Sequence, residues 1–263
     1  MIPVFVPSYK RPDAIFLKRS FLYDFPLYVF VRKEDSGYEF LKKRPNTHLV
    51  KLKNVHDIGE TRAAMIRYAA KKGIEKIFML DDDISRLDLT LFDREKGVAR
   101  ASGTVMGKPE NWRKALKCWE TTWDDEALFG ASYRPFSWSM KPDQIKAKVR
   151  AQLQQCVGVN VALLTEHGLN YRSNAEVGNE DLFLQWECYQ KGLSAVKTNA
   201  VQYDCPAMGS GTGGCNADGV QIEEKQVKRV KLFLEACNHD KMIRVATTRS
   251  GVPSIKFNWK EIV

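Results

Sequence analysis

The chain has 263 residues, of which 44% are hydrophobic and 28% charged, as in ordinary globular proteins. Thirteen Phe, nine Tyr and six Trp supply enough core material to exclude disorder as the main state. The formal net charge of +9 indicates, by itself, only an anionic partner. No apolar run approaches the roughly 20 residues of a membrane span, and the N-terminus lacks the pattern of a signal peptide. We therefore expect a cytoplasmic protein with no membrane partner.

Strands and helices alternate in the first 90 residues. Short apolar runs that end in polar loops predict strands over residues 2–7, 26–31, 48–52 and 76–80. Apolar side chains at helical spacing predict helices over residues 14–23, 38–43 and 58–72. This alternation indicates an α/β fold with a Rossmann-like, mostly parallel sheet that is flanked by helices.

The pattern is less regular after residue 90. Apolar runs predict strands over residues 87–91, 157–164, 195–203 and 254–259. Helical spacing predicts helices over residues 111–122, 143–155, 179–191 and 223–237. The remaining segments are a loop or hairpin, an aromatic stretch and a glycine-rich loop, at residues 98–108, 129–140 and 209–214. Because no repeat or low-complexity linker interrupts the chain, we expect one continuous domain.

Three adjacent carboxylates, those of Asp81, Asp82 and Asp83, follow the strand at 76–80 directly. They repel one another, and a bound cation would relieve that repulsion. Oxygen ligands suit Mg²⁺ or Mn²⁺, and ligands of open α/β sheets bind beyond the carboxyl ends of strands. The alternative is a solvated acidic turn or a cluster at a helix N-terminus.

A second acidic pair, Glu180 and Asp181, begins the helix predicted at 179–191. A carboxylate beside bound metal and substrate could act as a general base. Acidic residues in a first helical turn are also common as partners of the helix dipole, so this alternative stays open.

Polar and basic side chains follow the first strand and precede the acidic turn. The loop after the first strand could contact a nucleotide, and the alternative is an ordinary solvated turn; its residues are Ser8, Tyr9, Lys10 and Arg11. Arg62 lies on the helix before the acidic turn, near the same sheet edge, unless it is a surface arginine paired with Glu60 or Asp57.

Several other site classes find no support. The segment at 209–214 lacks the G-K-[ST] ending of a P-loop, and no G-x-S-x-G elbow is present. The four histidines form no H-x-x-x-H pair and the six cysteines no C-x-x-C pair, which disfavours a zinc site. The cysteines are therefore expected to be free core thiols.

Three segments together resemble glycosyltransferases of the GT-A, family-2-like type. They are VFVPSYKRP (4–12), IGETRAAMIRYAAKKGIEKIFMLDDDI (58–84) and GLNYRSNAEVGNEDLFLQWECYQKG (168–192). The glycine-rich loop and the ending IKFNW (255–259) narrow the resemblance to the TET-associated glycosyltransferases of bacteriophages. This implies a GT-A fold with a nucleotide-binding half (1–90), an acceptor-side half (91–222) and a basic C-terminal helix and tail (223–263).

The resemblance also implies roles for individual residues. Asp83 and Asp81 would bind Mn²⁺ or Mg²⁺, with His239 as a late third ligand that Asp204 could replace. Asp181 would be the catalytic base, with Glu180 as the alternative. The residues that would face a UDP-sugar are Pro7, Ser8, Tyr9, Arg11, Glu34, Arg62, Asp81 and Asp82.

The activity implied is metal-dependent, inverting transfer of a sugar from a UDP-sugar to 5-hydroxymethylcytosine or 5-hydroxymethyluracil in double-stranded phage DNA. A phage-encoded enzyme would work in the cytoplasm of its host. A base inside a duplex must be flipped out to react, and Tyr133, Phe136 and Trp138 could stack on it. The charge is unevenly distributed along the chain: residues 1–53 and 225–263 carry a net +6 each, and residues 54–224 carry a net −3. The basic tail could therefore contact a DNA backbone.

Three alternatives remain. The same type of enzyme could act on a polysaccharide or protein acceptor. An inactive GT-A fold could serve as a DNA-binding module, although the intact acidic motifs argue against it. A nucleotidyltransferase also needs paired carboxylates and a metal.

Overall fold

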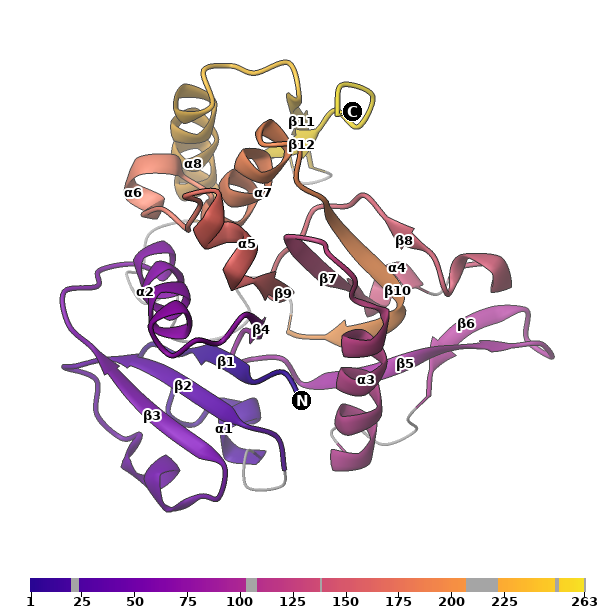
Figure 1. Ribbon diagram of the computed structural model, residues 1–263. Helices are drawn as coiled ribbons and strands as arrows, with labels where there is room; N and C mark the ends of the chain where they lie inside the picture. The colour runs from indigo at the N-terminus through magenta and orange to yellow at the C-terminus, as the bar shows by residue number, and fades with distance from the viewer. Residues whose placement is uncertain (20–23, 103–107, 138, 207–221, 249–250, 263) are drawn as a thin grey trace.

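The computed structural model describes residues 1–19, 24–102, 108–137, 139–206, 222–248 and 251–262 (Figure 1). The strands are β1 (Val4–Pro7), β2 (Leu27–Arg32), β3 (Thr47–Leu52), β4 (Lys76–Leu80), β5 (Arg86–Asp93), β6 (Val98–Ala101), β7 (Leu128–Tyr133), β8 (Lys148–Val149), β9 (Cys156–Asn160), β10 (Ala195–Asp204), β11 (Ile243–Thr247) and β12 (Pro253–Phe257). The helices are α1 (Ile15–Arg19), η2 (Glu39–Lys43), α2 (Ile58–Lys71), α3 (Pro109–Thr122), α4 (Arg134–Ser137), η3 (Pro142–Gln144), α5 (Val161–Glu166), α6 (Asn174–Val177), α7 (Glu180–Gln190) and α8 (Ile222–Ala236).

One mixed sheet runs through the N-terminal and central parts of the chain. Its strand order within the described residues is β3-β2-β1-β4-β9-β7-β10-β5-β6, and β8 pairs with β10 beside this path. The pairs β3–β2, β2–β1, β1–β4 and β7–β10 are parallel. The strands β9, β5, β6 and β8 pair antiparallel with their neighbours. The expected mixed α/β sheet flanked by helices is confirmed, with its parallel strands concentrated in the first 80 residues.

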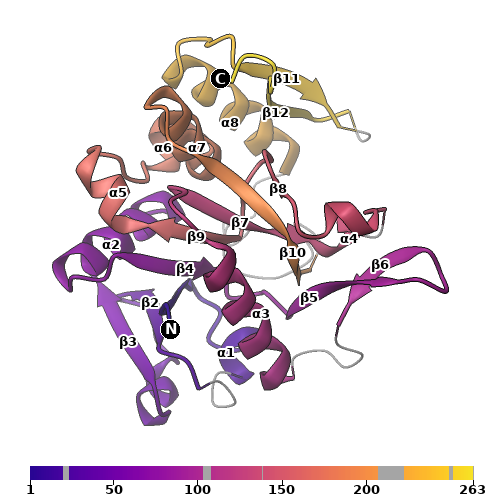
Figure 2. The same ribbon diagram turned by 45° about the vertical axis from the view of Figure 1, so that its right-hand side comes forward.

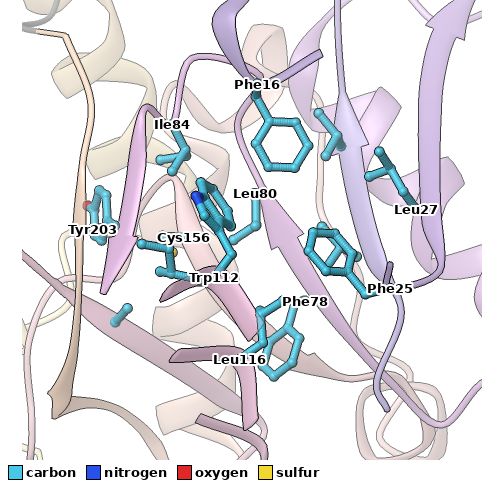
Figure 3. Packing of buried hydrophobic residues seen from close by; sticks show 14 of the residues in the cluster. Phe16, Phe25, Leu27, Phe78, Leu80, Ile84, Trp112, Leu116, Cys156 and Tyr203 are labelled. Carbon is cyan, nitrogen blue, oxygen red and sulfur yellow. The ribbon is translucent and has the colours of Figure 1, made fainter. Parts of the chain in front are cut away.

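Helices cover both faces of this sheet. On one face, α1 and α3 pack on β1, β2 and β4, and their core includes Phe16, Trp112, Trp119 and Phe78, all at most 1% exposed (Figure 3). On the other face, α2, α5 and α7 pack against the alternate side chains of the same strands, such as Phe5. Successive side chains of a strand point to opposite faces, so strands buried on both faces are apolar throughout.

The C-terminal part packs on the outer face of α7. Leu182 and Phe183 of that helix join Val230 and Phe233 of α8 and Phe257 of β12 in a third core. Figure 1 shows α8 and the β11–β12 hairpin beside α7. None of the helices in the described part of the chain has the length and apolar character that a membrane crossing requires.

Two contacts fix the N-terminus of α2 against the segment that leads into α7. Asp57 caps α2 by accepting a hydrogen bond from the Glu60 amide, and its other oxygen accepts one of 2.5 Å from the Ser173 hydroxyl. Gly59, two residues further along, lies directly against the backbone of Arg172. These contacts set the position of every later side chain of α2 relative to α7.

Two predicted elements are wrong. Residues 143–155 do not form a helix: the short η3 comes first, and β8 then pairs with β10. The apolar residues of this stretch alternate strictly, at 145, 147, 149, 151 and 153, which is the period of a strand. The strand predicted at 157–164 ends at Asn160, whose side chain accepts a hydrogen bond from the Leu163 amide and starts α5.

The close approach at Gly59 yields a stability prediction. A Cβ there would lie 1.9 Å from the carbonyl oxygen of Arg172 and 3.2 Å from Cβ of Glu180, so Gly59→Ala forces two backbone segments apart. We expect the free energy of unfolding to fall by about 1–3 kcal/mol in urea denaturation. At an unobstructed helix position alanine instead stabilises relative to glycine by about 1 kcal/mol, so a stabilised variant would contradict this packing.

Candidate active site

The carboxyl ends of β1, β2 and β4 meet at one edge of the sheet, because the three strands are neighbours and parallel. The loops that follow them begin with Ser8, Lys33 and Asp81. The N-termini of α2 and α7 reach the same edge, as the contacts between Arg62 and these loops show. This is the edge at which ligands of open α/β sheets bind.

Ser8 and Asp82 form a buried network beneath this edge. The Ser8 hydroxyl donates a 2.5 Å hydrogen bond to Asp82 Oδ2 and lies 2.9 Å from the hydroxyl of Tyr38, which in turn accepts from the Arg11 amide. Asp82 has no exposed surface, and its burial, opposed by the charge of Arg11, raises its pKa to about 7. Ser8 and Asp82 therefore hold the two loops together.

Arg11 and Asp83 lie above this network. The Arg11 guanidinium is 2.6 Å from Asp82 Oδ1 and 3.2 Å from Asp83 Oδ2. Burial and the charge of Asp81 raise the pKa of Asp83, against the attraction of Arg11. The other oxygen of Asp83, Oδ1, is buried and has no hydrogen-bond partner among the described residues.

Arg62 joins the two acidic motifs. Its guanidinium is 2.7 Å from Asp81 Oδ1 and 2.7 Å from Glu180 Oε1, and it also binds Asp181 Oδ1. The side chain is only 4% exposed, so these carboxylates neutralise a buried cation. Asp81 and Asp181, which are 100 residues apart in the chain, therefore lie on either side of one guanidinium.

The local sequence explains why the acidic pair faces Arg62. Asn179 caps α7 by accepting from the Leu182 amide, and the Glu180 amide donates a 3.0 Å hydrogen bond to the side chain of Asn174. Burial raises the pKa of Asp181; Arg62 opposes this, and the charges of Glu180 and Asp81 add to it. Asp181 is thus a carboxyl of only 14% exposure with a raised pKa at a helix N-terminus, beside the acidic turn.

The family model of the TET-associated glycosyltransferases matches residues 2–213, which include every residue of the site described above. The chain belongs to the TET-associated glycosyltransferases. It is thus a glycosyltransferase. No curated protein sequence matches it.

Solved structures support the fold. The crystal structure of residues 1–349 of Staphylococcus aureus TarS in complex with UDP-GlcNAc matches with a TM-score of 0.51 at 13% identity, over 90% of this chain and 71% of that chain. A longer S. aureus TarS structure matches with a TM-score of 0.51 at 14% identity, over 90% of this chain and 43% of that one. A further crystal structure of S. aureus TarS residues 1–349 matches with a TM-score of 0.48, and this TET-associated glycosyltransferase spans 66% of its length.

The other residues predicted to face the nucleotide lie at the same edge with different surroundings. Pro7 is buried as the last residue of β1, and the ring of Tyr9 is covered by the Arg32 guanidinium, 3.8 Å from its centroid. Glu34 is exposed in the loop after β2.

Asp35, in the same loop, was not predicted from the sequence as a site residue. It is buried, with 7% exposure, and its Oδ2 has no hydrogen-bond partner among the described residues. Burial raises its pKa. The only sequence feature that could have indicated Asp35 is its position next to Glu34, after the second strand.

The two candidates for a third metal ligand lie in different places. His239 follows α8, and the next residue, Asp240, bonds Trp186 and Gln190 near the C-terminal end of α7. Asp181 starts that 11-residue helix, about 16 Å long, so the structure does not bring His239 to the acidic turn. Asp204 does come close, because its carbonyl oxygen accepts a 2.9 Å hydrogen bond from the Ser85 amide.

Charge also gathers around Asp204. Its carboxylate is 2.7 Å from Arg134 Nη1. Burial, with the negative charges of Asp83, Asp81 and Asp204, raises the pKa of the adjacent Cys205 thiol to about 12. No group of three or more His, Cys, Asp or Glu side chains within the described ranges is arranged as a complete metal site.

The structure describes only part of the aromatic and glycine-rich segments that were candidates for contacting the acceptor or the donor. Tyr133 packs against Tyr203 with ring centroids 5.5 Å apart, and Phe136 lies in α4. Trp138 and the glycine-rich loop at 209–214 lie outside the described residues.

The Arg62 cluster gives the second prediction. Arg62→Leu removes the cation and leaves the carboxylates of Asp81, Glu180 and Asp181 close together and largely shielded from water, so we expect the free energy of unfolding at pH 7 to fall by about 3–5 kcal/mol. The loss should shrink as the pH falls, since the carboxylates of the variant are then protonated. Urea denaturation at several pH values measures both effects.

Arg67→Leu is the matched control, because Arg67 is exposed on the same helix. We expect it to change stability by no more than about 0.5 kcal/mol. Equal losses in the two variants would contradict a specific role for Arg62.

Proposed function

We propose that this glycosyltransferase moves a sugar from a UDP-sugar to the hydroxyl of a 5-hydroxymethylpyrimidine base in double-stranded DNA, with inversion. The observation that carries the proposal is the contact of one buried cation, Arg62, with Asp81 on one side and Asp181 on the other. Residues suited to a donor diphosphate and a residue suited to deprotonate an acceptor are thereby gathered at one edge of the sheet.

A nucleotide donor is supported by the loops after β1 and β2. Arg11 offers a guanidinium beside the acidic turn, and Asp35 offers a buried carboxylate oxygen that no described residue satisfies. The S. aureus TarS fragment with a similar fold is a complex with UDP-GlcNAc, which is the reason to name UDP as the nucleotide.

A divalent cation fits the acidic turn. The buried Oδ1 of Asp83, which has no partner among the described residues, and the carboxylate of Asp81 are hard oxygen ligands. Asp204 is a further acid whose backbone lies beside the turn, whereas we assign no metal role to His239. Mg²⁺ and Mn²⁺ commonly bind through one or two carboxylates plus substrate phosphates. Bound there, such an ion would neutralise the diphosphate leaving group.

The chain's own residues supply orientation and proton removal. Asp181 accepts the proton of the acceptor hydroxyl, and Glu180 is the alternative base. Arg62 contacts both carboxylates and Asp81 and so fixes their positions. A single base that deprotonates the acceptor directly implies single displacement and inversion.

The DNA acceptor rests on the family and on charge. TET-associated is part of the family's name, and the net positive charge of residues 225–263 suits a phosphate backbone. A base within a duplex must leave the stack to reach the edge of the sheet, so the acceptor is expected to flip.

Transfer to DNA is tested directly by mass. The protein is incubated with 5-hydroxymethylcytosine or 5-hydroxymethyluracil DNA, UDP-glucose or UDP-N-acetylglucosamine and Mn²⁺, and the digested nucleosides are weighed. We expect a hexose or N-acetylhexosamine mass gain that EDTA abolishes, and a loss of activity of at least about 100-fold in a folded Asp83→Asn variant. No gain with any common nucleotide sugar would exclude the DNA acceptor.

The raised pKa of Asp181 predicts a pH dependence. A base must be ionised, so we expect kcat/KM to fall as the pH is lowered through an apparent pKa above the ordinary aspartate value of 3.8. Glu180→Gln removes a negative charge that raises this pKa, and should move the acid limb to lower pH while activity persists. Loss of activity in Glu180→Gln, with activity retained in Asp181→Asn, would make Glu180 the base.

A further inference from the structure

A basic cleft lies between the segment after β8 and the C-terminal hairpin. Its volume is about 290 Å³. It is lined by three cations, two aromatic side chains, an amide and an alanine: Arg150, Arg244, Lys256, Phe257, Trp259, Gln152 and Ala151. Figure 2 shows the β11–β12 hairpin near the top of the molecule, with β8 below it. None of these lining residues is acidic.

Uncharged groups hold two of the cations in place. The Arg150 guanidinium donates to the carbonyl oxygen of Ile262. Lys256 Nζ donates a 3.1 Å hydrogen bond to Gln152 Oε1, while Gln152 Nε2 donates one of 2.8 Å to the carbonyl oxygen of Ile255. These contacts fix the positions of the charges without neutralising them.

Arg244 and Lys256 oppose each other directly across the hairpin. Like charges in this position destabilise a strand pair unless an anion lies between them. None of the three cations forms an ion pair with a carboxylate in the part of the chain that the structure describes, whereas Lys231 and Lys241 pair with Glu235 and Glu261. The cleft thus brings together three cations whose charge no carboxylate of the described residues neutralises.

The cleft is connected to the acidic turn by a short stretch of backbone. Residues 150–155 lead from the cleft to Gln155, whose carbonyl oxygen accepts a 2.9 Å hydrogen bond from the Asp81 amide. Five residues span at most about 17 Å, which is the rise of about five base pairs. One duplex can therefore contact the cleft and present a base to the site.

We propose that this cleft, with Arg150, Arg244 and Lys256, binds the phosphodiester backbone of the acceptor DNA, a few base pairs from the base that is modified. The inference rests on the proposed DNA acceptor and assigns the backbone contact to these side chains. Phosphate contacts of this kind set the register of a protein on DNA without reading its sequence. The half-buried Trp259 beside the cations can pack against the deoxyribose.

The test uses the full chain and the double variant Arg244→Gln/Lys256→Gln. Fluorescence anisotropy with a labelled duplex of about 20 base pairs gives the association constant from 50 to 200 mM salt. Each phosphate contact contributes about −0.9 to the slope of log K against log salt, so the slope of the variant should be less negative by about 2. The KM for hydroxymethylated duplex should rise severalfold, with the KM for the UDP-sugar unchanged.

Two further double variants serve as controls for charge removed elsewhere and for charge retained in the cleft. Arg67→Gln/Lys71→Gln removes the same charges from exposed positions of α2 and should leave the slope as in the wild type. Arg244→Lys/Lys256→Arg keeps both charges and should restore it. If the wild type glycosylates DNA and Arg244→Gln/Lys256→Gln keeps the wild-type slope, the cleft is not the backbone site. A raised KM for the UDP-sugar would assign the cleft to the nucleotide and overturn the inference, whereas a wild type that does not glycosylate DNA refutes the proposed function itself.

Discussion

The architecture of the site depends on one buried guanidinium. Arg62 can stay ionised in the interior only because Asp81, Glu180 and Asp181 surround it, and those acids can stay close together only because Arg62 is between them. The contacts of Asp57 with Ser173 and of Gly59 with Arg172 bring the two helix N-termini to the required separation. Fold and site are therefore not separable: the packing that positions α2 against α7 also positions Asp181, the proposed base, against the acidic turn.

The acidic turn divides its work among three neighbouring residues. Asp82 points into the protein, where Ser8 and Arg11 hold it, and so joins the loop after β1 to the end of β4. Asp81 faces Arg62, and Asp83 keeps one buried oxygen that has no hydrogen-bond partner among the described residues. Such a division lets a single dense cluster of charge hold two loops together and still leave an oxygen for the proposed cation, because the three carboxylates do not all face the same group.

The sequence predicted the parallel strands and α2 well, because buried strands such as 76–80 are apolar throughout and end in a sharp change to charge. It located Arg62, Asp81 and Asp181 at one site through the resemblance, and the structure brings the three together. It failed at 143–155, where a period of two was taken for a helix, and at Asn160, where a capping side chain ends a strand. The role of Asp35 and the distance of His239 depend on tertiary packing, which no local pattern contains.

The helix α7 contributes to two cores at once. Leu184 and Cys188 face the sheet, while Leu182 and Phe183 face α8 and the hairpin. The family match ends at residue 213, before these last elements, yet without them an apolar surface of the helix that carries Asp181 would be open to water. The C-terminal segment therefore has a role in the fold that is separate from anything it binds, because it keeps this one face of the helix dry.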